Sequence, residues 1–358
     1  MITPHSFTKD WLMHLNRVNN WNRKETQLKN VEKAIVALYL LECLVQTQFD
    51  FIFKGGTSLL LHFGKINRFS VDIDLIANEI PLNLNCIFEQ VCANNQIFYR
   101  FERQNRKRDE VFLTQHFKFF YRPFADETDE SYILLDIYPI INPYAKIVEL
   151  EIKSDILNTM GNNISVKSPD IDSLLGDKLT AFAPTTIGIS LIAEPDYRPK
   201  RVEVLKQLYD IGLLFDSCQN VAHIRQSYWT IAQHEIKQKK LALSPEDVLR
   251  DSDNWAFLIG HSGKLNNGDY QLLAKGFNEF SKFVSDMHFT EQEAVLCAAK
   301  TAYLSRVLLT GAMTVEKYDD IIDMKQWKIE EKRFEKFNDY KYINQVAFFY
   351  WMKSIYNS

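Results

Sequence analysis

Two adjacent glycines, Gly55 and Gly56, stand where a short segment of aromatic and β-branched residues at 50–54 ends. That pattern predicts a strand followed by a tight turn, and Thr57 and Ser58 then precede an apolar helix as an N-cap would. Because glycine has no Cβ, the backbone of such a turn can approach a phosphate closely, and the free N–H groups of a helix start attract negative charge. The turn is therefore a candidate phosphate cradle, although Gly-Gly alone equally fits an ordinary strand–turn–helix joint.

Two aspartates follow the turn within one helix length. Asp72 and Asp74 alternate with apolar residues over 71–75, so a strand there places both carboxylates on one face. Like charges at that spacing repel each other unless a cation neutralises them, and Mg²⁺ prefers carboxylate oxygens. The alternative is a solvent-facing edge strand with two harmless acids. The glycine turn before the pair, and Arg68 in the intervening loop, favour a site where a phosphate meets a divalent metal, as nucleotidyl transfer requires.

A third carboxylate is expected on another strand. Asp136 is the one acid in the apolar segment 132–138, and a neighbouring strand could bring it beside the aspartate pair. Two-metal phosphoryl transfer uses such a group to orient or deprotonate the attacking hydroxyl. The alternative is a strand-end aspartate that caps the turn before Pro139. His62 and His116 have no metal-ligand partner at a recognised spacing, so we expect both to be structural.

Charged residues also lie in the helical second half. Lys178 follows Asp177 on an apolar helix, where it could neutralise triphosphate charge or could simply face solvent. Lys206 and Asp210 stand at i and i+4 on a later helix, which equally describes an ordinary helix salt bridge. The densest basic cluster follows aromatic residues and could grip an RNA backbone or be a solvated loop; it consists of Arg100, Arg103, Arg106, Lys107 and Arg108.

Composition restricts the class of protein. The chain has 358 residues, of which 46% are hydrophobic and 25% charged, so it is expected to form one large or two ordinary globular domains. The net charge of −4 argues against a globally basic, nucleic-acid-coating surface. Five scattered cysteines without CxxC spacing favour a reducing compartment. The N-terminus is not a signal peptide, and the apolar run at 34–45 is too short to span a bilayer, so we expect a soluble cytoplasmic protein that makes no membrane contact.

The periodicity predicts an α+β protein that divides near residue 165. We expect an α/β domain over 1–165 and a helical domain over 166–358 that completes a nucleotide and substrate cleft. Expected strands lie at 50–54, 71–75, 96–101, 115–121, 132–138, 148–152 and 164–167. Expected helices lie at 27–47, after the glycines, and at 84–94, 170–183, 199–216, 219–237, 246–259, 269–284, 289–311 and 329–354.

With these residues in place, the chain resembles the AbiEii/AbiGii toxin family of nucleotidyltransferases. That family belongs to the DNA polymerase β-like superfamily and includes toxins of type IV toxin–antitoxin and abortive-infection (phage defence) systems. The resemblance covers roughly residues 30–215 and implies a polymerase β-like core, a mixed sheet with helices, followed by a helical half. The motifs that carry it are Lys54-Gly55-Gly56-Thr57-Ser58, Arg68-Phe69-Ser70-x-Asp72-x-Asp74, Asp177-Lys178-Leu179-x-Ala181 and Lys206-x-x-x-Asp210.

The resemblance implies a Mg²⁺-dependent enzyme that moves a nucleoside monophosphate from an NTP to an acceptor hydroxyl, with RNA or tRNA as acceptor and a cognate antitoxin as partner. The resemblance assigns triphosphate binding to Gly55, Gly56, Thr57 and Ser58, with Lys54 and Arg68 beside them. It assigns metal binding to Asp72 and Asp74, and Asp136 is the candidate third metal ligand from the strand pattern above. It assigns phosphate contacts to Lys178 and Lys206, with Asp210 in the same pocket.

The sequence departs from the family pattern at two places. Gln207 stands where the late motif has its first aspartate, directly after the lysine, and residues 184–188 occupy a stretch where many members have an arginine. Two other functions therefore stay open. One is nucleotidyl transfer to a small molecule or a protein, and the other is a nucleotide-binding module that has lost its activity.

Overall fold

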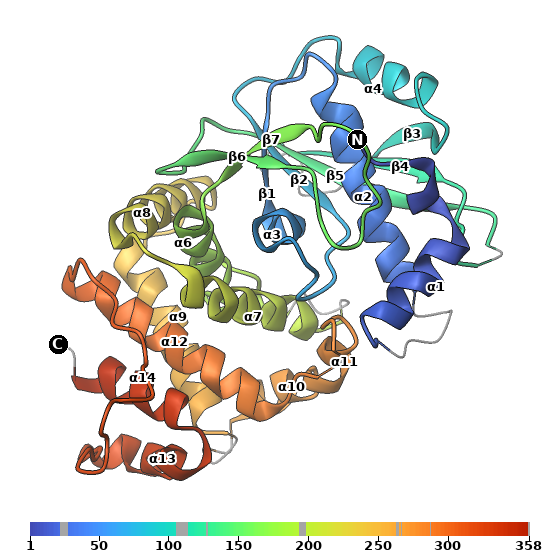
Figure 1. Cartoon of the computed structure of the whole chain (residues 1–358). Helices are drawn as coiled ribbons and strands as arrows, with labels where there is room; N and C mark the ends of the chain where they lie inside the picture. The colour runs from blue at the N-terminus through green and yellow to red at the C-terminus, as the bar shows by residue number, and fades with distance from the viewer. Residues whose placement is uncertain are drawn as a thin grey trace. The chain divides into compact units, whose positions relative to one another are not determined.

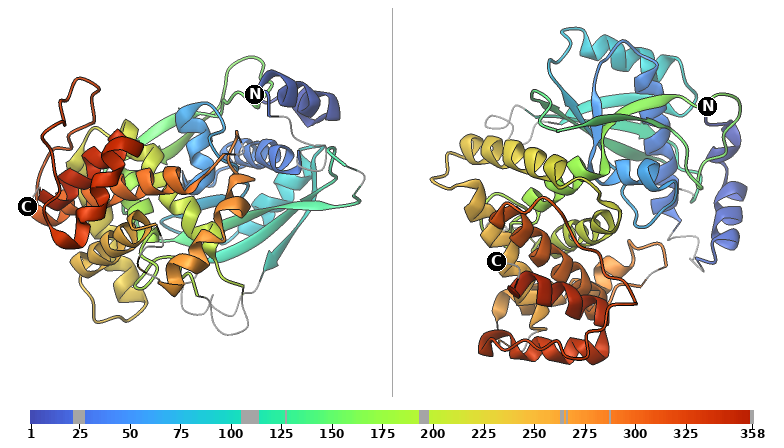
Figure 2. Two further views of the ribbon diagram at one scale, coloured as in Figure 1. Left: turned by 90° about the horizontal axis from the view of Figure 1, so that it is seen from below. Right: turned by 60° about the vertical axis from the view of Figure 1, so that its left-hand side comes forward.

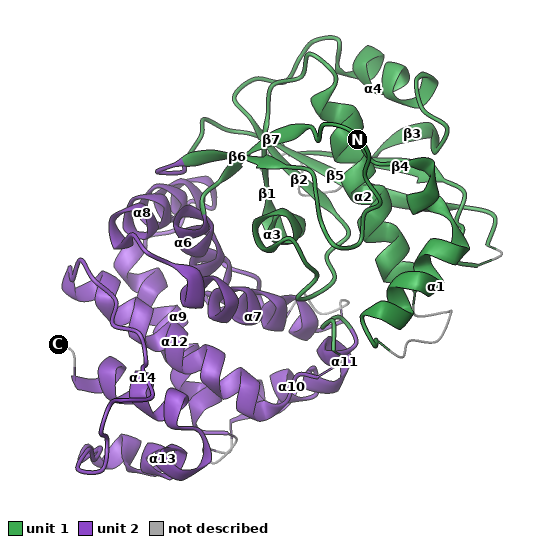
Figure 3. Ribbon diagram, viewed as in Figure 1, with its two compact units in different colours: residues 1–143, 147–170, 283–287 green, residues 144–146, 171–282, 288–358 purple. Residues whose placement is uncertain are grey.

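The computed structural model describes residues 1–21, 28–104, 114–126, 128–192, 198–262, 265, 267–286 and 288–356. The chain forms two compact units (Figure 3). Unit 1 comprises residues 1–143, 147–170 and 283–287, and unit 2 comprises residues 144–146, 171–282 and 288–358. The predicted α+β class is confirmed, with a mixed five-stranded sheet in unit 1 and a helical C-terminal half (Figure 1).

The sheet of unit 1 has the strand order β1-β2-β5-β4-β3. Its members are β1 (Ile52–Lys54), β2 (Ile73–Ala77), β5 (Ser131–Pro139), β4 (Gln115–Tyr121) and β3 (Phe98–Gln104). The β2–β5 pair is parallel and the other pairs are antiparallel. A separate antiparallel pair is formed by β6 (Ile147–Glu151) and β7 (Ser165–Pro169).

One face of this sheet carries the core of unit 1. In β4 and β5 the alternate residues Phe117, Phe119, Ile133, Leu135 and Ile137 are buried. They belong to one hydrophobic cluster with α2 (Lys29–Val45) and α4 (Leu84–Ala93), which lie beside the sheet (Figures 1 and 2). Since successive strand residues point to opposite faces, the residues between them project from the other face.

Shorter helices complete unit 1. They are a 3₁₀ helix η1 (Pro4–Phe7), α1 (Lys9–Val18) and α3 (Gly55–Phe63), of which the last begins directly after β1. Glu32 on α2 is buried and accepts hydrogen bonds from the Tyr121 hydroxyl at 2.8 Å and the Phe124 N–H at 2.8 Å. Burial raises the pKa of Glu32, and these donors oppose that rise.

Unit 2 is built from helices around α12 (Glu291–Thr310), which packs against α7 (Arg201–Ser217), α9 (Pro245–Gly260) and α14 (Gln345–Tyr356). Helix α6 (Ile171–Ala181) packs against α7 and α8 (Val221–Gln238). Gly176 allows α6 to approach α8 closely, because a Cβ there would stand 2.6 Å from the Ile224 carbonyl oxygen. Within the described residues, every helix is too short or too polar to cross a membrane.

Two predicted helices are wrong as single elements. The segment 269–284 forms α10 (Gly268–Ala274) and α11 (Phe277–Ser281). Gly276 lies between them and close to α7, because a Cβ added to it would stand 3.0 Å from the side chains of Arg201 and Leu205. The segment 329–354 forms a 3₁₀ helix η3 (Lys332–Asp339), α13 (Tyr340–Ile343) and α14. Asn344 separates the last two because it is extended and its side chain accepts from the Ala347 N–H at 3.0 Å.

Candidate functional site

A row of polar side chains crosses the sheet of unit 1 on the face opposite the core. Lys54 of β1 pairs in register with Asp74 of β2, Asp74 with Asp136 of β5, and Asp136 with His116 of β4. Strand partners in register project from the same face, so the two carboxylates are neighbours and a basic side chain flanks each of them. The predicted meeting of Asp74 and Asp136 on adjacent strands is thus present in the structure.

The glycine turn lies directly over this row. Gly55 has a φ of +81°, a conformation that L-residues rarely adopt, and a Cβ added to it would overlap the Asp74 Oδ2 atom. A Cβ on Gly56 would overlap Arg68 Nη2 and lie 2.8 Å from Ser70 Oγ. The turn, one carboxylate and one guanidinium therefore meet in a space that no side chain at 55 or 56 could share.

The expected N-cap at Thr57 and Ser58 is wrong. Helix α3 begins at Gly55, with Lys54 as the N-cap residue, so both hydroxyl residues lie within its first turn. The positive φ of Gly55 lets the chain enter the helix at once. Thr57 Oγ1 donates instead to the Asp72 carbonyl oxygen at 2.6 Å, and Ser58 Oγ donates to the Gly55 carbonyl oxygen at 2.8 Å. The Thr57 bond ties the first turn of α3 to the residue that precedes β2.

The three predicted carboxylates differ in their surroundings. Asp72 is exposed and lies just before β2, whereas Asp74 lies within β2 and is partly buried. Asp136 lies inside β5, which continues to Pro139, so it does not cap a strand end. Its Oδ1 atom lies 2.7 Å from His116 Nδ1, and the two side chains are 16% and 9% exposed. Sequence reasoning missed this contact of His116, because strand register brings the two residues together over a separation of 20 positions.

The loop that leads to the aspartates is held by a distant segment of the chain. Arg68 is buried and donates from Nη1 to the Phe69 carbonyl oxygen at 3.2 Å. Residues 283–285 run antiparallel to this loop, where the Phe69 N–H donates to the Phe283 carbonyl oxygen at 2.7 Å and the Ser285 N–H donates to Asn67 at 3.0 Å. This backbone pairing fixes the loop that carries the buried guanidinium.

A second group of predicted residues comes together in unit 2. Lys178 of α6 and Asp210 of α7 form an ion pair of 2.8 Å, and Asp210 is fully buried. Lys178 Nζ also donates to Gln207 Oε1 at 3.2 Å. Lys178 is 5% exposed, which excludes the surface interpretation of this residue. Lys206, the remaining member of the motif, is partly buried on the same helix.

The basic cluster is only partly described. Arg100 lies on β3, where it pairs with Glu130 at 2.8 Å and with Glu102, so acids already compensate its charge. Arg103 lies on the same strand. The remaining members, Arg106, Lys107 and Arg108, lie outside the described residues.

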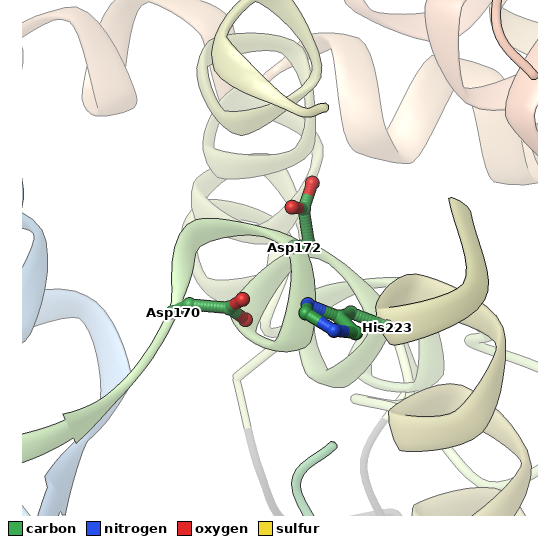
Figure 4. Close-up of side chains that lie close together, drawn as sticks. All are labelled: Asp170, Asp172 and His223. Atoms are coloured by element: carbon green, nitrogen blue, oxygen red, sulfur yellow. The ribbon is translucent and has the colours of Figure 1, made fainter. Parts of the chain in front are cut away.

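A group that the sequence did not indicate is formed by Asp170, Asp172 and His223 (Figure 4). Asp170 precedes α6, Asp172 lies in its first turn and His223 lies in the first turn of α8. Each offers one potential metal-ligand atom, and these atoms lie within 4.8 Å of one another. Asp172 also accepts from the Gln219 and Asn220 N–H groups at 2.9 and 3.1 Å, which holds the segment just before α8.

Comparison with known proteins gives one family. The sequence model of the family described as "Nucleotidyl transferase AbiEii toxin, Type IV TA system" matches residues 39–283, a range that includes both groups of site residues. No curated protein matches the chain significantly. A solved structure, MenT4, a nucleotidyltransferase toxin from Mycobacterium tuberculosis H37Rv, is similar with a TM-score of 0.44 and 16% identity. The similarity covers 85% of this chain and 99% of that one, and it is too distant to support an argument about chemistry.

Proposed function

We propose a specific reaction for this chain, which belongs to the AbiEii family of nucleotidyltransferase toxins of type IV toxin–antitoxin systems. In that reaction an acceptor hydroxyl gives up its proton, for which Asp136 is the candidate base, and its oxygen attacks the α-phosphorus of an NTP. The bond from the α-phosphorus to the oxygen shared with the β-phosphate breaks, and pyrophosphate leaves. The observation that supports it best is the row in which Asp74 and Asp136 are neighbours while the side-chain-free turn at Gly55 lies over Asp74. Paired like charges beside a turn without side chains fit a cation that carries phosphates.

Each side chain has a proposed role. Asp72, Asp74 and Asp136 would hold Mg²⁺, which when bound stabilises charge on the phosphates and on the attacking oxygen. Their crowding suits a hard cation, because two neighbouring carboxylates repel until one is present. The turn at Gly55 and Gly56 would accept the triphosphate; the basic side chains assigned to its charge are Lys54, Arg68, Lys178 and Lys206.

The proposed acceptor is the hydroxyl of an RNA, with tRNA as the candidate class, and the proposed setting is the cytoplasm, with a cognate antitoxin as partner. This part rests on the family resemblance. One observation favours a second candidate, a small molecule or a protein, because Glu130 and Glu102 compensate the charge of Arg100 in the basic cluster proposed to bind RNA.

The reaction is tested with each radiolabelled NTP, Mg²⁺ and total cellular RNA. We expect one NTP to label an RNA species, and we expect Asp72→Ala to lose at least about 10³-fold in rate, which corresponds to roughly 4 kcal/mol of transition-state stabilisation. Asp320→Ala, which removes an exposed aspartate of unit 2, is the matched control and should transfer normally. Full transfer by a folded Asp72→Ala protein would contradict the assignment.

The acceptor class is tested by neutralising the basic cluster. Glutamine replacements at Arg103, Arg106, Lys107 and Arg108 should reduce transfer to RNA about tenfold or more and weaken its salt dependence. The control carries four glutamines at exposed lysines of unit 2, namely Lys237, Lys328, Lys332 and Lys336. Equal rates for both variants would favour the small-molecule or protein acceptor.

A further inference from the structure

We propose that His116 is a positioning residue for Asp136, an assignment that rests on the proposed nucleotidyl transfer. Its ring N–H holds the Asp136 carboxylate in the orientation needed to receive a metal ion and the attacking hydroxyl. Neither the motifs nor the family resemblance points to this residue, which the sequence alone predicts to be structural.

The geometry of the contact supports a directed hydrogen bond. The 2.7 Å separation of His116 Nδ1 from Asp136 Oδ1 is short for a nitrogen–oxygen pair and typical of one in which the acceptor is ionised. A carboxylate accepts hydrogen bonds, so the proposal assigns the proton of this bond to Nδ1. Both side chains are largely shielded from water, so solvent competes little for this bond.

The bond has a consequence for the other carboxylate oxygen. An aspartate carboxylate turns about two single bonds, and a donor fixed at Oδ1 sets the plane of the group and hence the direction of the Oδ2 lone pairs. His116 is itself fixed, because it is 8% exposed and lies in β4, a strand that is paired with β5 on one side and β3 on the other. Groups that orient metal ligands in this way alter metal affinity or activity by about 10–100-fold when removed.

The place of His116 in the row supports the same role. Asp74 and Asp136 are neighbours, and their outer strand partners are Lys54 and His116. A lysine at position 116 would add a mobile full charge, whereas the imidazole ring supplies one donor in a fixed direction. An ordinary core histidine would need a hydrogen-bond partner but would have no reason to use a carboxylate of this row.

Two substitutions separate positioning from packing. His116→Leu removes the donor and keeps an apolar side chain of useful size, whereas His116→Asn places an amide N–H close to the position of Nδ1–H. His62→Leu is the matched control, because His62 belongs to the same unit and its Nε2 contacts Ser168 Oγ at 3.3 Å, outside the row. Thermal unfolding of each variant measures what the fold itself loses.

Two quantities are measured. The first is Mn²⁺ affinity, monitored by electron paramagnetic resonance in the presence of a non-hydrolysable NTP, and the second is the steady-state rate of nucleotide transfer. We expect His116→Leu to weaken Mn²⁺ binding and to lower kcat by about 10–100-fold, with the KM for NTP little changed. His116→Asn should recover both to within about threefold of wild type, and His62→Leu should change neither beyond what its stability explains.

Three results would overturn the inference. They are wild-type Mn²⁺ affinity in His116→Leu, equal losses in the Leu and Asn variants, and losses that follow the unfolding temperature alone. If any of these occurs while wild-type protein transfers nucleotide and Asp72→Ala does not, the proposed function stands and only the role of His116 falls. If Asp72→Ala binds Mn²⁺ and transfers nucleotide as wild type does, both proposals fall together.

Discussion

Acidic side chains are held in opposite ways in the two units. In unit 1, Asp74 and Asp136 are register partners on adjacent parallel strands, so like charges face each other. In unit 2, Asp210 is fully buried, and the opposite charge of Lys178 lies 2.8 Å away. Both arrangements include residues of the family motifs, yet in one two acids are neighbours and in the other an acid is paired directly with a lysine.

The difference separates acids that a cation could bridge from an acid that already has its counter-charge. A buried ion pair needs nothing further, but removing one partner leaves a charge that the interior cannot solvate. A pair of carboxylates gains from a cation and loses little fold stability when one acid is removed. Unit 1 can also hold a buried acid by hydrogen bonds without a second acid beside it, as it does with Glu32. The pairing of Asp74 with Asp136 is therefore not a general way in which this unit accommodates acids.

The largest effect is expected from breaking the pair in unit 2. Lys178→Met should reduce the free energy of unfolding by about 3–5 kcal/mol, because Asp210 is left buried and charged. The double variant Lys178→Met/Asp210→Leu should recover most of that loss without recovering transfer. Denaturant unfolding of the full chain, monitored by intrinsic fluorescence, measures it.

Lys300→Met is the control for this variant. Lys300 is as buried as Lys178 but pairs at 2.7 Å with Asp216, whose side chain is 54% exposed. Water can solvate the aspartate that remains, so the loss should be near 1 kcal/mol or less. Equal losses at the two lysines would mean that burial of the acid does not decide the effect.

A smaller effect is expected from adding one methyl group over the carboxylates of unit 1. Gly55→Ala and Gly64→Ala share the strain of a positive φ, +81° and +67°, which costs roughly 1–2 kcal/mol in either case. Only the Cβ at position 55 would overlap Asp74, since among the described residues no atom lies within 4 Å of the one at 64. We therefore expect about 100-fold slower transfer for Gly55→Ala alone. If Gly55→Ala and Gly64→Ala are equally stable and transfer nucleotide at similar rates, the turn at Gly55 is not part of the active site.

The smallest effect is expected at Asp253 on α9, an acid of which only one carboxylate oxygen has a partner among the described residues. Its Oδ2 pairs with Arg306 at 3.0 Å, while its buried Oδ1 has no hydrogen-bond partner within the described residues. Burial raises the pKa of Asp253 to about 6 from an ordinary value of 3.8, and Arg306 opposes that rise. Because the folded-state pKa is the higher one, this carboxyl favours folding below pH 4, and the contribution is lost as pH rises to 6.

Asp253→Asn cannot ionise and so lacks this dependence. The Tm of the variant minus that of wild type should increase by a few degrees between pH 4 and pH 6, as measured by calorimetry. A difference that stays constant over this range would show that Arg306 compensates the charge completely.

Local patterns predicted the parts of the unit 1 site that depend on alternation within one segment. The apolar residues around Asp74 and Asp136 are enough to define two strands, and the glycines are enough to define a turn. The N-cap at Thr57 failed because the conformation of Gly55 decides where α3 begins. The burial of Lys178 follows from the packing of α6 on α7, which no periodicity within α6 reports.

Two further features depend on residues far apart in the sequence. The contact of His116 with Asp136 depends on the register in which β4 pairs with β5. A shift of one residue would remove this contact and would turn the core-facing side chains of β4 to the opposite face of the sheet. The prediction of one helix at 329–354 failed because the folded chain holds Asn344 extended. Nothing in the local sequence pattern indicates this break. Sequence periodicity identifies segments, and tertiary packing decides where each one begins and ends.

The pairing of residues 283–285 with the loop at 67–69 bears on how the chain is made. A ribosome releases the sheet and α2 long before it releases this late segment, and domains begin to fold as soon as their parts emerge. Unit 1 can therefore collect its strands early, but the loop before Asp72 gains its last backbone bonds only when most of the chain exists. A nascent or prematurely terminated chain that stops before residue 283 carries every carboxylate of the row and lacks the bonds that fix Arg68, so the site is completed only after residues 283–285 have been made.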